Sequence, residues 1–525
     1  MPMRETMPKR LRTVPRTPVT AALLCLALGC ARVSGSGGGP HDGGDAAPAP
    51  NAPDAVAQDL PSSFNDASAN DASAPSNDAD AASGPCINLQ CRQVTCAGGA
   101  TTSVSGTVFA PNGTLPLYNV AVYVPNAQLE PFPAGVTCDR CGTPVSGKPI
   151  VSTLSNSEGK FKLLNVPAGM NIPLVFQVGK WRRQVTVPSA TACQDTALID
   201  PSMTRLPRNR TEGDIPKIAV TTGDCDQLGC LLPKLGIDAS ELGIAGENRA
   251  AAYFTGSSET VSGTPAHVAT FGPANMRPTT ELWNNEAALS KYDMTLLSCE
   301  CTENLTTKTA TSFSAMNNYL AKGGRIFGTD YAYVWLKYSP DRDLTAAVVI
   351  PGGEPGWAQT PLAIDTSFPK GKALAEWMKF VDPAAVYGAI QATTVLNNVR
   401  SVMPPSALAW ASSKTGVAPG LLAWPPGFPP PLGAASVDPN APPRPRILTV
   451  NTPAGMPSDK QCGRAAFLDA HIVDATYSAP VGSKFPGNCG TSFSKGEEAL
   501  AFLFFDLAAC IQDDTRPVIP PIIIP

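Results

Sequence analysis

Hydrophobic and polar residues alternate with the two-residue period of β-strands through residues 97–210, and clusters of turn residues separate the runs. The first run ends at Pro111-Asn112-Gly113, which is a typical turn sequence. No segment of this region repeats apolar residues with the 3.6-residue period of a helix. Short strands between Gly and Pro turns predict a β-sandwich, which with its cysteine-rich start occupies residues 86–210. The expected strands are 103–110, 120–125, 160–163, 172–178 and 184–187.

The pattern changes in residues 214–515, where short apolar runs alternate with helical segments. Phe313, Met316 and Leu320 follow a helical period that ends at a Gly-Gly pair, and Ser494 to Glu497 form a capping box that opens a last helix. Alternation of strands and helices predicts an α/β domain with a mostly parallel sheet covered on both faces. The expected strands are 218–223, 293–297, 325–328, 447–450 and 464–468.

Two segments depart from this alternation. Residues 338–446 are rich in proline and are expected to form an irregular insertion over the sheet. Residues 516–525 form a tail of proline and isoleucine. We therefore expect a multidomain chain, in which a β-sandwich is followed by an α/β domain with one large insertion.

The first thirty residues have the form of a secretory signal. Five basic residues and one acid precede the apolar run 19–28, which is about half of the ~20 residues that span a bilayer as a helix. The ending Leu26-Ala27-Leu28-Gly29-Cys30 resembles the lipobox of bacterial lipoproteins, although that family prefers Leu where Ala27 stands. The resemblance implies that 1–30 is a lipoprotein signal peptide and that Cys30 carries the lipid. Cleavage by ordinary signal peptidase, which gives a freely secreted protein, is the alternative.

Residues 31–85 consist almost entirely of Gly, Ala, Ser, Pro, Asn and Asp. Eight aspartates and one arginine give this segment a net charge of −7, and it has too few apolar residues to bury a core. We expect a disordered tether that holds the folded part away from the membrane. The expected location is therefore the cell surface or outer membrane, with the membrane as a partner through the lipid anchor.

Thirteen cysteines follow the signal segment, and in a secreted chain they indicate disulfides. Because thirteen is odd, at least one thiol is free or pairs between molecules. The C-x-x-C spacing of Cys138 and Cys141 also suits zinc, but we favour disulfides because the compartment is oxidising and the chain has three histidines. The same reasoning predicts disulfides for Cys299 and Cys301. No metal and no cofactor is expected.

Two motif sets carry family resemblances. "SVSGTVFAPNG", "NVAVYVP" and "SNSEGKFKLLNVPAG" resemble the carboxypeptidase regulatory-like domain, a prealbumin-type sandwich, with Asn156 or Ser157 where that family usually has Asp. This resemblance implies a stability or adhesion module without catalysis. "KYDMTLLSCE", "FSAMNNYLAKGGRIFGTDYAYVW" and "CGRAAFLDAHIVD" resemble the class I glutamine amidotransferase-like fold, near its ThuA-like branch.

The second resemblance implies a catalytic triad that this sequence does not complete. The nucleophilic Cys of working amidotransferases aligns on Asp330, and a carboxylate does not supply an acyl-transfer thiolate. His471 stands where the family has its His, but Val473 occupies the place of the acid and Asp474 comes one residue later. The resemblance therefore implies a catalytically inactive domain.

Acidic residues near strand ends leave a hydrolase open as the alternative. Carboxylates at the carboxyl edge of an α/β sheet can act as general acid and base, although such residues are more often caps. The candidates for such a site are Asp330, His471, Asp469 and Glu300, with Asp293 and Glu303 as further strand-end acids. This alternative is a secreted, carboxylate-dependent hydrolase that acts on glycans or amides.

Charge excludes a polyanionic partner. Residues 86–525 carry a net charge of about −1 and have no basic stripe, so we expect no nucleic-acid binding. Trp181-Arg182-Arg183 is either an exposed contact or an edge-strand aromatic with flanking charges. The function that these observations favour is a surface lipoprotein with a binding or structural role, whose partner is a cell-envelope polysaccharide or a protein.

Replacement of Cys30 by alanine tests the anchor. We expect this variant to leave the membrane fraction and the detergent phase, because the thiol that takes the lipid is absent. Phase partitioning with detergent measures the effect, and unchanged partitioning would contradict the lipidation of Cys30.

Overall fold

The computed structural model describes residues 86–256, 271–352, 357–358, 360–392, 395–416, 440–472 and 484–523. The expected signal segment with Cys30, the expected tether and the acid candidate Asp474 lie outside the described residues. Among the residues that are described, no helix has both the length and the apolar character that crossing a bilayer requires.

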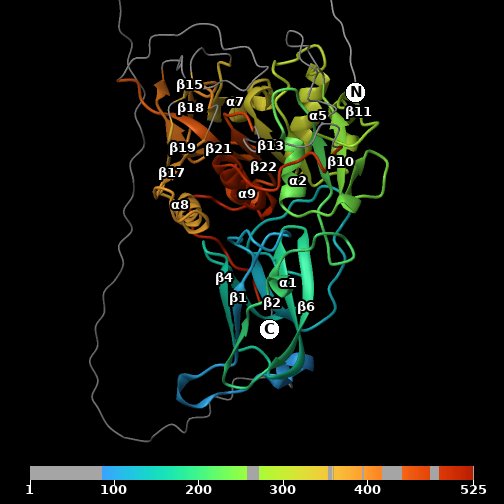
Figure 1. Ribbon diagram of the computed structural model, residues 1–525, viewed down its shortest axis with the longest axis vertical. Helices are drawn as coiled ribbons and strands as arrows, with labels where there is room; N and C mark the ends of the chain where they lie inside the picture. Colours follow the sequence, from blue (N-terminus) through green and yellow to red (C-terminus); the bar gives the residue numbers. More distant parts are fainter. Residues whose placement is uncertain are drawn as a thin grey trace, which may run out of the picture. The chain divides into compact units, whose positions relative to one another are not determined.

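The first region is a β-sandwich, as the sequence predicted (Figure 1). One sheet has the order β4-β1-β7 and the other β3-β2-β5-β6. Phe161 of the first sheet meets Phe176 of the second edge to face, with ring centroids 5.8 Å apart, so the two sheets pack directly on each other. The strands are β1 (Ser103–Thr107), β2 (Ala121–Pro125), β3 (Pro149–Leu154), β4 (Lys160–Leu164), β5 (Gly169–Val178), β6 (Trp181–Ala190) and β7 (Asp195–Leu198), preceded by the 3-10 helices η1 (Asn88–Arg92) and η2 (Ala97–Gly99) and followed by α1 (Pro201–Thr204).

The second region is built on a mixed sheet with the order β11-β10-β8-β12-β13-β22-β21-β19-β16-β17, with β9 beside β10. The strands from β11 to β22 are parallel, and those from β21 to β17 are antiparallel. The prediction of a mostly parallel sheet therefore holds for the first part alone. The strands are β8 (Ile218–Thr221), β9 (Leu242–Ile244), β10 (Ala251–Thr255), β11 (Arg277–Pro278), β12 (Met294–Leu297), β13 (Arg325–Thr329), β16 (Leu362–Ile364), β17 (Ala389–Ile390), β19 (Ala407–Ser413), β21 (Arg444–Thr452) and β22 (Gly463–Leu468).

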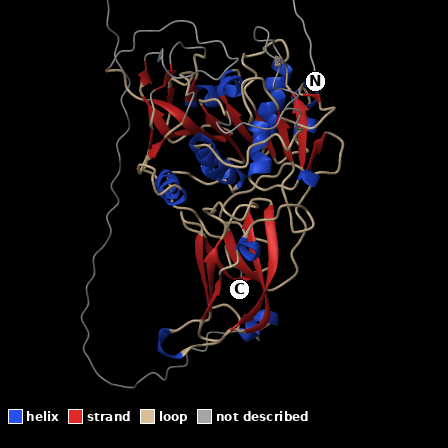
Figure 2. Cartoon of the chain, viewed as in Figure 1, coloured by secondary structure: helices blue, strands red, loops and turns tan. Residues whose placement is uncertain are grey.

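Helices cover both faces of this sheet, and Figure 2 shows helices and strands together in this region. On β13, Ile326 belongs to the apolar cluster that contains α5, and Phe327 belongs to the cluster that contains α9. The last helix begins at the predicted capping box, in which Ser494 and Glu497 bond reciprocally to backbone N–H groups. The helices are α2 (Leu231–Lys234), α3 (Thr280–Trp283), α4 (Glu286–Leu289), α5 (Ala310–Ala321), α6 (Val334–Lys337), α7 (Arg342–Ala347), α8 (Pro369–Val381) and α9 (Lys495–Ala508), with the 3-10 helices η3 (Leu228–Cys230), η4 (Ala239–Glu241), η6 (Asp330–Tyr333) and η7 (Ser458–Lys460).

The described parts of residues 338–446 form regular elements, so the prediction of an irregular insertion was wrong for them. They supply three strands of the main sheet and α8, whose buried face includes Leu374 and Trp377. Most of the prolines in these described parts stand outside the helices and strands. The same segment forms two small strand pairs, β14 (Val348–Val349) with β18 (Ser401–Val402), and β15 (Trp357–Ala358) with β20 (Thr415–Gly416).

Aromatic side chains join the sandwich to the α/β region. Trp181 is fully buried and its ring centroid lies 5.8 Å from that of Phe505 on α9. The indole Nε1 of Trp377 donates to the carbonyl of Pro116 at 2.8 Å, across the same junction. Trp181 begins β6, the edge strand of its sheet, as one of the two expectations held. The other expectation, an exposed contact, was wrong, and the flanking Arg182 is not solvent-exposed either, because Trp181 and Arg182 have 0% and 4% exposure.

Six disulfides cross-link the described chain, and two of them join the sandwich to the α/β region. Cys138 pairs with Cys462 and Cys141 pairs with Cys510, so the C-x-x-C residues bind two distant partners and not each other. The zinc alternative for this pair is wrong. The other bridges are Cys86–Cys91, Cys96–Cys193, Cys225–Cys301 and Cys230–Cys489.

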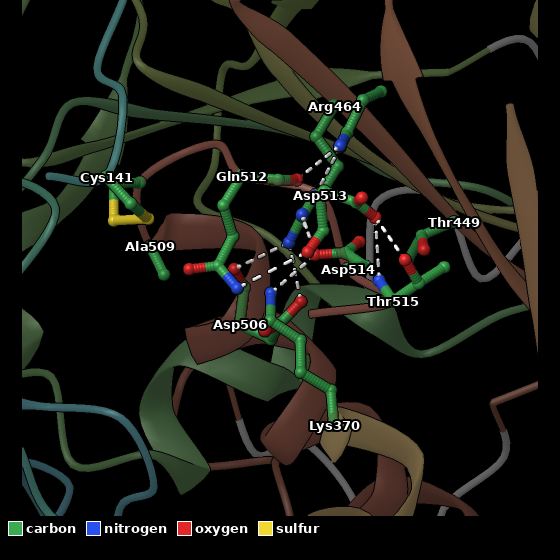
Figure 3. A network of polar contacts seen from close by, with 12 residues as sticks. Cys141, Lys370, Thr449, Arg464, Asp506, Ala509, Gln512, Asp513, Asp514 and Thr515 are labelled. Atoms are coloured by element: carbon green, nitrogen blue, oxygen red, sulfur yellow. Dashed lines mark hydrogen bonds and ion pairs between the residues drawn. A yellow bond between two sulfur atoms is a disulfide. The ribbon is translucent and has the colours of Figure 1, made fainter. Parts of the chain in front are cut away.

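A buried cluster of four charges holds the carboxyl-terminal part of the chain together (Figure 3). Arg464 of β22 contacts Asp506 of α9 at 2.7 Å and also contacts Asp514, while Lys370 of α8 lies 2.7 Å from Asp506 and 2.8 Å from Asp514. All four side chains are at most 5% exposed. Burial alone would raise the pKa of Asp514, but Arg464 and Lys370 outweigh it and hold this pKa below its usual value.

Removing the two bridges of the junction tests their contribution to stability. We expect replacement of Cys138, Cys141, Cys462 and Cys510 by serine to lower the free energy of unfolding by ~2–4 kcal/mol per bridge. These bridges close segments of 324 and 369 residues, which cost more entropy to close than short ones. Thermal unfolding measures the change. The matched control replaces Cys86 and Cys91, which are 5 residues apart, and an equal loss in both variants would contradict this account.

Candidate functional site

The strongest cluster of chemically active side chains lies at the carboxyl ends of four parallel strands. Loops that follow β8, β12, β13 and β22 begin at this edge of the sheet. In open α/β sheets this edge is where ligands bind. The cluster consists of Asp226 after β8, Cys299 after β12, Asp330 after β13, Asp469 and His471 after β22, and Asn398 and Arg446 from the antiparallel part.

Asp330 occupies the turn between β13 and η6, which leads directly into α6. Its backbone φ is +39°, a left-handed conformation that side-chain-bearing residues rarely adopt. A strand, a sharp turn and a helix at this position are also how a nucleophile is presented in several hydrolase folds. The side chain is fully buried, so the turn directs a carboxylate into the cluster and not into solvent.

Both carboxylate oxygens of Asp330 have close protein partners. The Nδ2 of Asn398 donates to Oδ1 at 2.9 Å, and the thiol of Cys299 donates to Oδ2 at 2.9 Å. The Nε2 of His471 lies 3.4 Å from Oδ2. Burial raises the pKa of Asp330 to about 6, and the charges of Asp469 and Asp226 add to this effect against the opposing influence of His471 and Cys299.

His471 lies between two carboxylates. Its Nδ1 is 3.6 Å from Oδ1 of Asp226, on the side of the ring away from Asp330. Burial favours the neutral imidazole, but Asp330 and Asp226 outweigh it, so the pKa of His471 is raised. The sequence named His471 and Asp330 as candidates for one site, and the structure brings them together. It did not identify Asp226.

Asp226 is fixed by backbone and side-chain donors. Its carboxylate accepts from the backbone N–H of Ile472 at 2.6 Å and of Cys299 at 2.9 Å, and from the hydroxyl of Thr329. The carboxylate thus ties together the segments that follow three strands. The sequence analysis looked for the acid partner of His471 at residues 473 and 474. The carboxylate that lies beside His471 belongs to Asp226, 245 residues earlier in the chain. Local sequence spacing cannot reveal such a distant partner.

Asp469 belongs to the same cluster but faces Arg446. The guanidinium NH1 of Arg446 is 3.3 Å from Oδ2, and the side-chain amide of Asn398 donates to Oδ1 at 2.9 Å. The Nδ2 of Asn398 therefore bridges Asp469 and Asp330. Asn398 comes from the segment that the sequence treated as an irregular insertion, so it was missed.

The remaining candidate acids lie in structural ion pairs. Glu300 forms a buried pair with Lys308, and its Oε2 also accepts from Asn304 at 3.3 Å. Glu303 accepts from two tyrosine hydroxyls and from Lys337 at 2.6 Å. Asp293 precedes β12 and pairs with a lysine of the sandwich at the opposite edge of the sheet, so its assignment to the carboxyl edge was wrong.

Cys299 has a free thiol, and the prediction that it forms a disulfide was wrong. Cys301 pairs with Cys225, as expected of one member of the C-x-C pair. Burial and the charges of Asp330 and Asp226 raise the pKa of Cys299 well above its ordinary value, so the thiol keeps its proton. The odd number of cysteines predicted that at least one thiol is free or pairs between molecules, but it did not identify Cys299 as that thiol.

Comparison with known proteins adds little to this geometry. No family model matches the chain, and no curated protein matches it. Among solved structures, a type II cohesin–X-dockerin complex from Acetivibrio cellulolyticus, crystallised as an N-terminal interface mutant, matches at 14% identity with a TM-score of 0.15. That match covers 29% of this chain and 88% of the other chain, and its TM-score is too low to carry an argument.

Replacement of Asp330 by asparagine tests the electrostatics of the cluster. The folded-state pKa of about 6 lies above the ordinary value of 3.8, so the native fold binds more protons than the unfolded chain between these values and loses stability as pH rises through them. The side-chain amide of the Asp330→Asn variant carries no charge, so this variant does not lose that stability as pH rises. We expect Asp330→Asn to gain on the order of 2 kcal/mol relative to the native chain between pH 4 and pH 7.

Chemical denaturation at both pH values, with a chelator present, measures this difference. Glu303→Gln is the matched control, because the pKa of Glu303 is lowered by Lys337 and its hydroxyl partners in spite of partial burial. That control should lose stability relative to the native chain as pH rises. A gain for Asp330→Asn that is larger at pH 4 than at pH 7 would contradict the buried-charge account.

Proposed function

We propose that this protein is a lipid-anchored surface protein with a binding or structural role, and that its α/β domain is not a cysteine-type amidotransferase. The observation that carries the proposal is the identity and environment of Asp330. It occupies the turn where such an enzyme places its thiolate, and both of its oxygens accept hydrogen bonds from protein groups. A carboxylate there would repel the oxyanion that acyl transfer creates.

Cys299 does not supply the missing nucleophile in this proposal. Its thiol donates to Asp330 and faces a second carboxylate, Asp226, close by. A reactive cysteine requires a positive environment that favours the thiolate, and this environment is negative. The thiol therefore acts as a hydrogen-bond donor in the polar network.

The architecture supports a display role. Two disulfides and a buried aromatic contact link the sandwich to the α/β region, so the two regions would be displayed together. An anchor at Cys30 and a long, acidic tether would hold that surface away from the membrane. The ligand class that we favour is a cell-envelope polysaccharide or a protein.

A second candidate function is favoured by the line Asp330–His471–Asp226. The two contacts of His471, at 3.4 and 3.6 Å, place an imidazole between two carboxylates in the order that a nucleophile, a base and an orienting acid require. In this alternative Asp330 attacks the carbon of an amide or glycoside, the bond to the amine or hydroxyl leaving group breaks, and that group takes the proton of His471. The neutral His471 then takes a proton from a water molecule, which hydrolyses the covalent intermediate and frees the carboxylate of Asp330. The protein is then a carboxylate-dependent hydrolase.

Turnover of glutamine, amide and glycoside substrates by the exported full chain separates the two candidates. The proposed function predicts no product above the blank, with the same result for His471→Ala and Asp330→Ala. Turnover that either substitution abolishes would contradict the proposal and establish the hydrolase. Glu303→Gln is the control for both variants, since Glu303 lies at the same sheet edge but bonds only to Tyr333, Lys337 and Tyr338 in the described contacts.

A further inference from the structure

We propose that Cys299, His471 and Asp330 form a binding site for a divalent transition-metal cation of the zinc type, with Asp226 orienting the histidine. This inference goes beyond the proposed function, because a bound cation is compatible with a structural, binding or catalytic role. It rests on four properties of the cluster: the kinds of donor atom, their separations, the contact behind the histidine, and the balance of buried charge.

The donor set is the one that zinc prefers. A cysteine sulfur, an imidazole nitrogen and a carboxylate oxygen are its usual protein ligands, and three such ligands leave one position open. Zinc binds them at about 2.0–2.3 Å, so ligand atoms in a tetrahedral site lie about 3.3–3.6 Å apart. In this structure Oδ2 of Asp330 is 2.9 Å from Sγ of Cys299 and 3.4 Å from Nε2 of His471.

Three rigid elements deliver these donors. Cys299 follows β12, Asp330 opens the turn after β13, and His471 follows β22, and these strands are neighbours in the order β12-β13-β22. A sulfur of Cys299, a sulfur of Cys225 and a ring nitrogen of His471 all lie within 4.8 Å of one another. Cys225 is not counted as a ligand, because its sulfur is bonded to Cys301.

Asp226 stands in the position of the second-shell carboxylate that many metal sites use. Metal-binding histidines usually donate the N–H of their other ring nitrogen to a carboxylate or carbonyl, which fixes the tautomer and turns the free lone pair toward the metal. Here Asp226 is 3.6 Å from Nδ1 of His471, while Nε2 faces Asp330. The donors of Ile472 and Cys299 hold Asp226 in that place.

The charge of the cluster also accommodates a divalent cation. Asp226, Asp330 and Asp469 are each at most 2% exposed. Within the described part of the chain, the positively charged side chains in contact with them are Arg446, on Asp469, and His471, between the other two. A divalent ion that displaces one proton from His471 and one from the Cys299 thiol leaves the summed charge of these groups unchanged, so binding adds no uncompensated buried charge.

Metal titration of the exported full chain, purified without reductant and treated with EDTA, tests the site. The probes are zinc, measured by competition with a chromophoric chelator, and cobalt(II), whose thiolate charge-transfer absorption reports a sulfur ligand. We expect one ion per chain and that absorption. Cys299→Ala should abolish the absorption, Asp330→Asn should weaken zinc binding, and Asp226→Asn should weaken it by about 10–100-fold, as second-shell changes do.

Glu303→Gln is the matched control and should bind zinc as the native chain does. Thermal unfolding of each metal-free variant checks that it is folded, and Asp330→Asn keeps the shape of the native side chain. Absence of stoichiometric binding by the native chain overturns the proposal. So does binding that is equal in native chain, Cys299→Ala and Asp330→Asn, since the ion would then lie elsewhere. Failure here leaves the turnover test of the proposed function unaffected, because that test measures product and not metal.

Discussion

The carboxyl-terminal part of this protein depends on four buried charged side chains that neutralise one another. Lys370, Arg464, Asp506 and Asp514 come from α8, β22, α9 and the segment after α9, and each of the two carboxylates contacts both cations. Removing one member of such a cluster leaves an uncompensated charge, which typically costs about 3–5 kcal/mol. The cluster therefore specifies how these four segments meet, whereas apolar packing alone would allow them to slide.

Strand β22 connects this charge cluster to the candidate site. Arg464 at the beginning of the strand is held by Asp506 and Asp514, and the strand delivers Asp469 and His471 at its other end. A shift of β22 by one residue would turn every side chain to the opposite face. The buried charges at one edge of the sheet thus fix the register that brings His471 to Asp330 at the other edge.

The sequence predicted those elements that are specified by residues close together in the chain. The turn Pro111-Asn112-Gly113, the capping box at Ser494 and the buried strand that became β13 depend on residues near each other in sequence. The features that were missed depend on distant residues: Asn398 lies 68 residues after Asp330, and Asp226 lies 246 residues before Ile472. The strands of 338–446 were missed for a related reason, because they are short and their pairing decides their conformation: β19 pairs with β21, β16 with β19, and β17 with β16.

The two bridges from Cys138 and Cys141 also impose an order on biogenesis. A chain crosses a membrane or leaves a ribosome from its amino end, so the sandwich emerges first, with Cys96 and Cys193 available to pair within it. Cys138 and Cys141 then have to remain reduced, or in temporary bonds, until partners 324 and 369 residues later arrive. An oxidised Cys138–Cys141 pair formed too early would be a trap. Folding of this chain therefore calls for thiol–disulfide exchange that can reopen such a pair once the α/β region has formed.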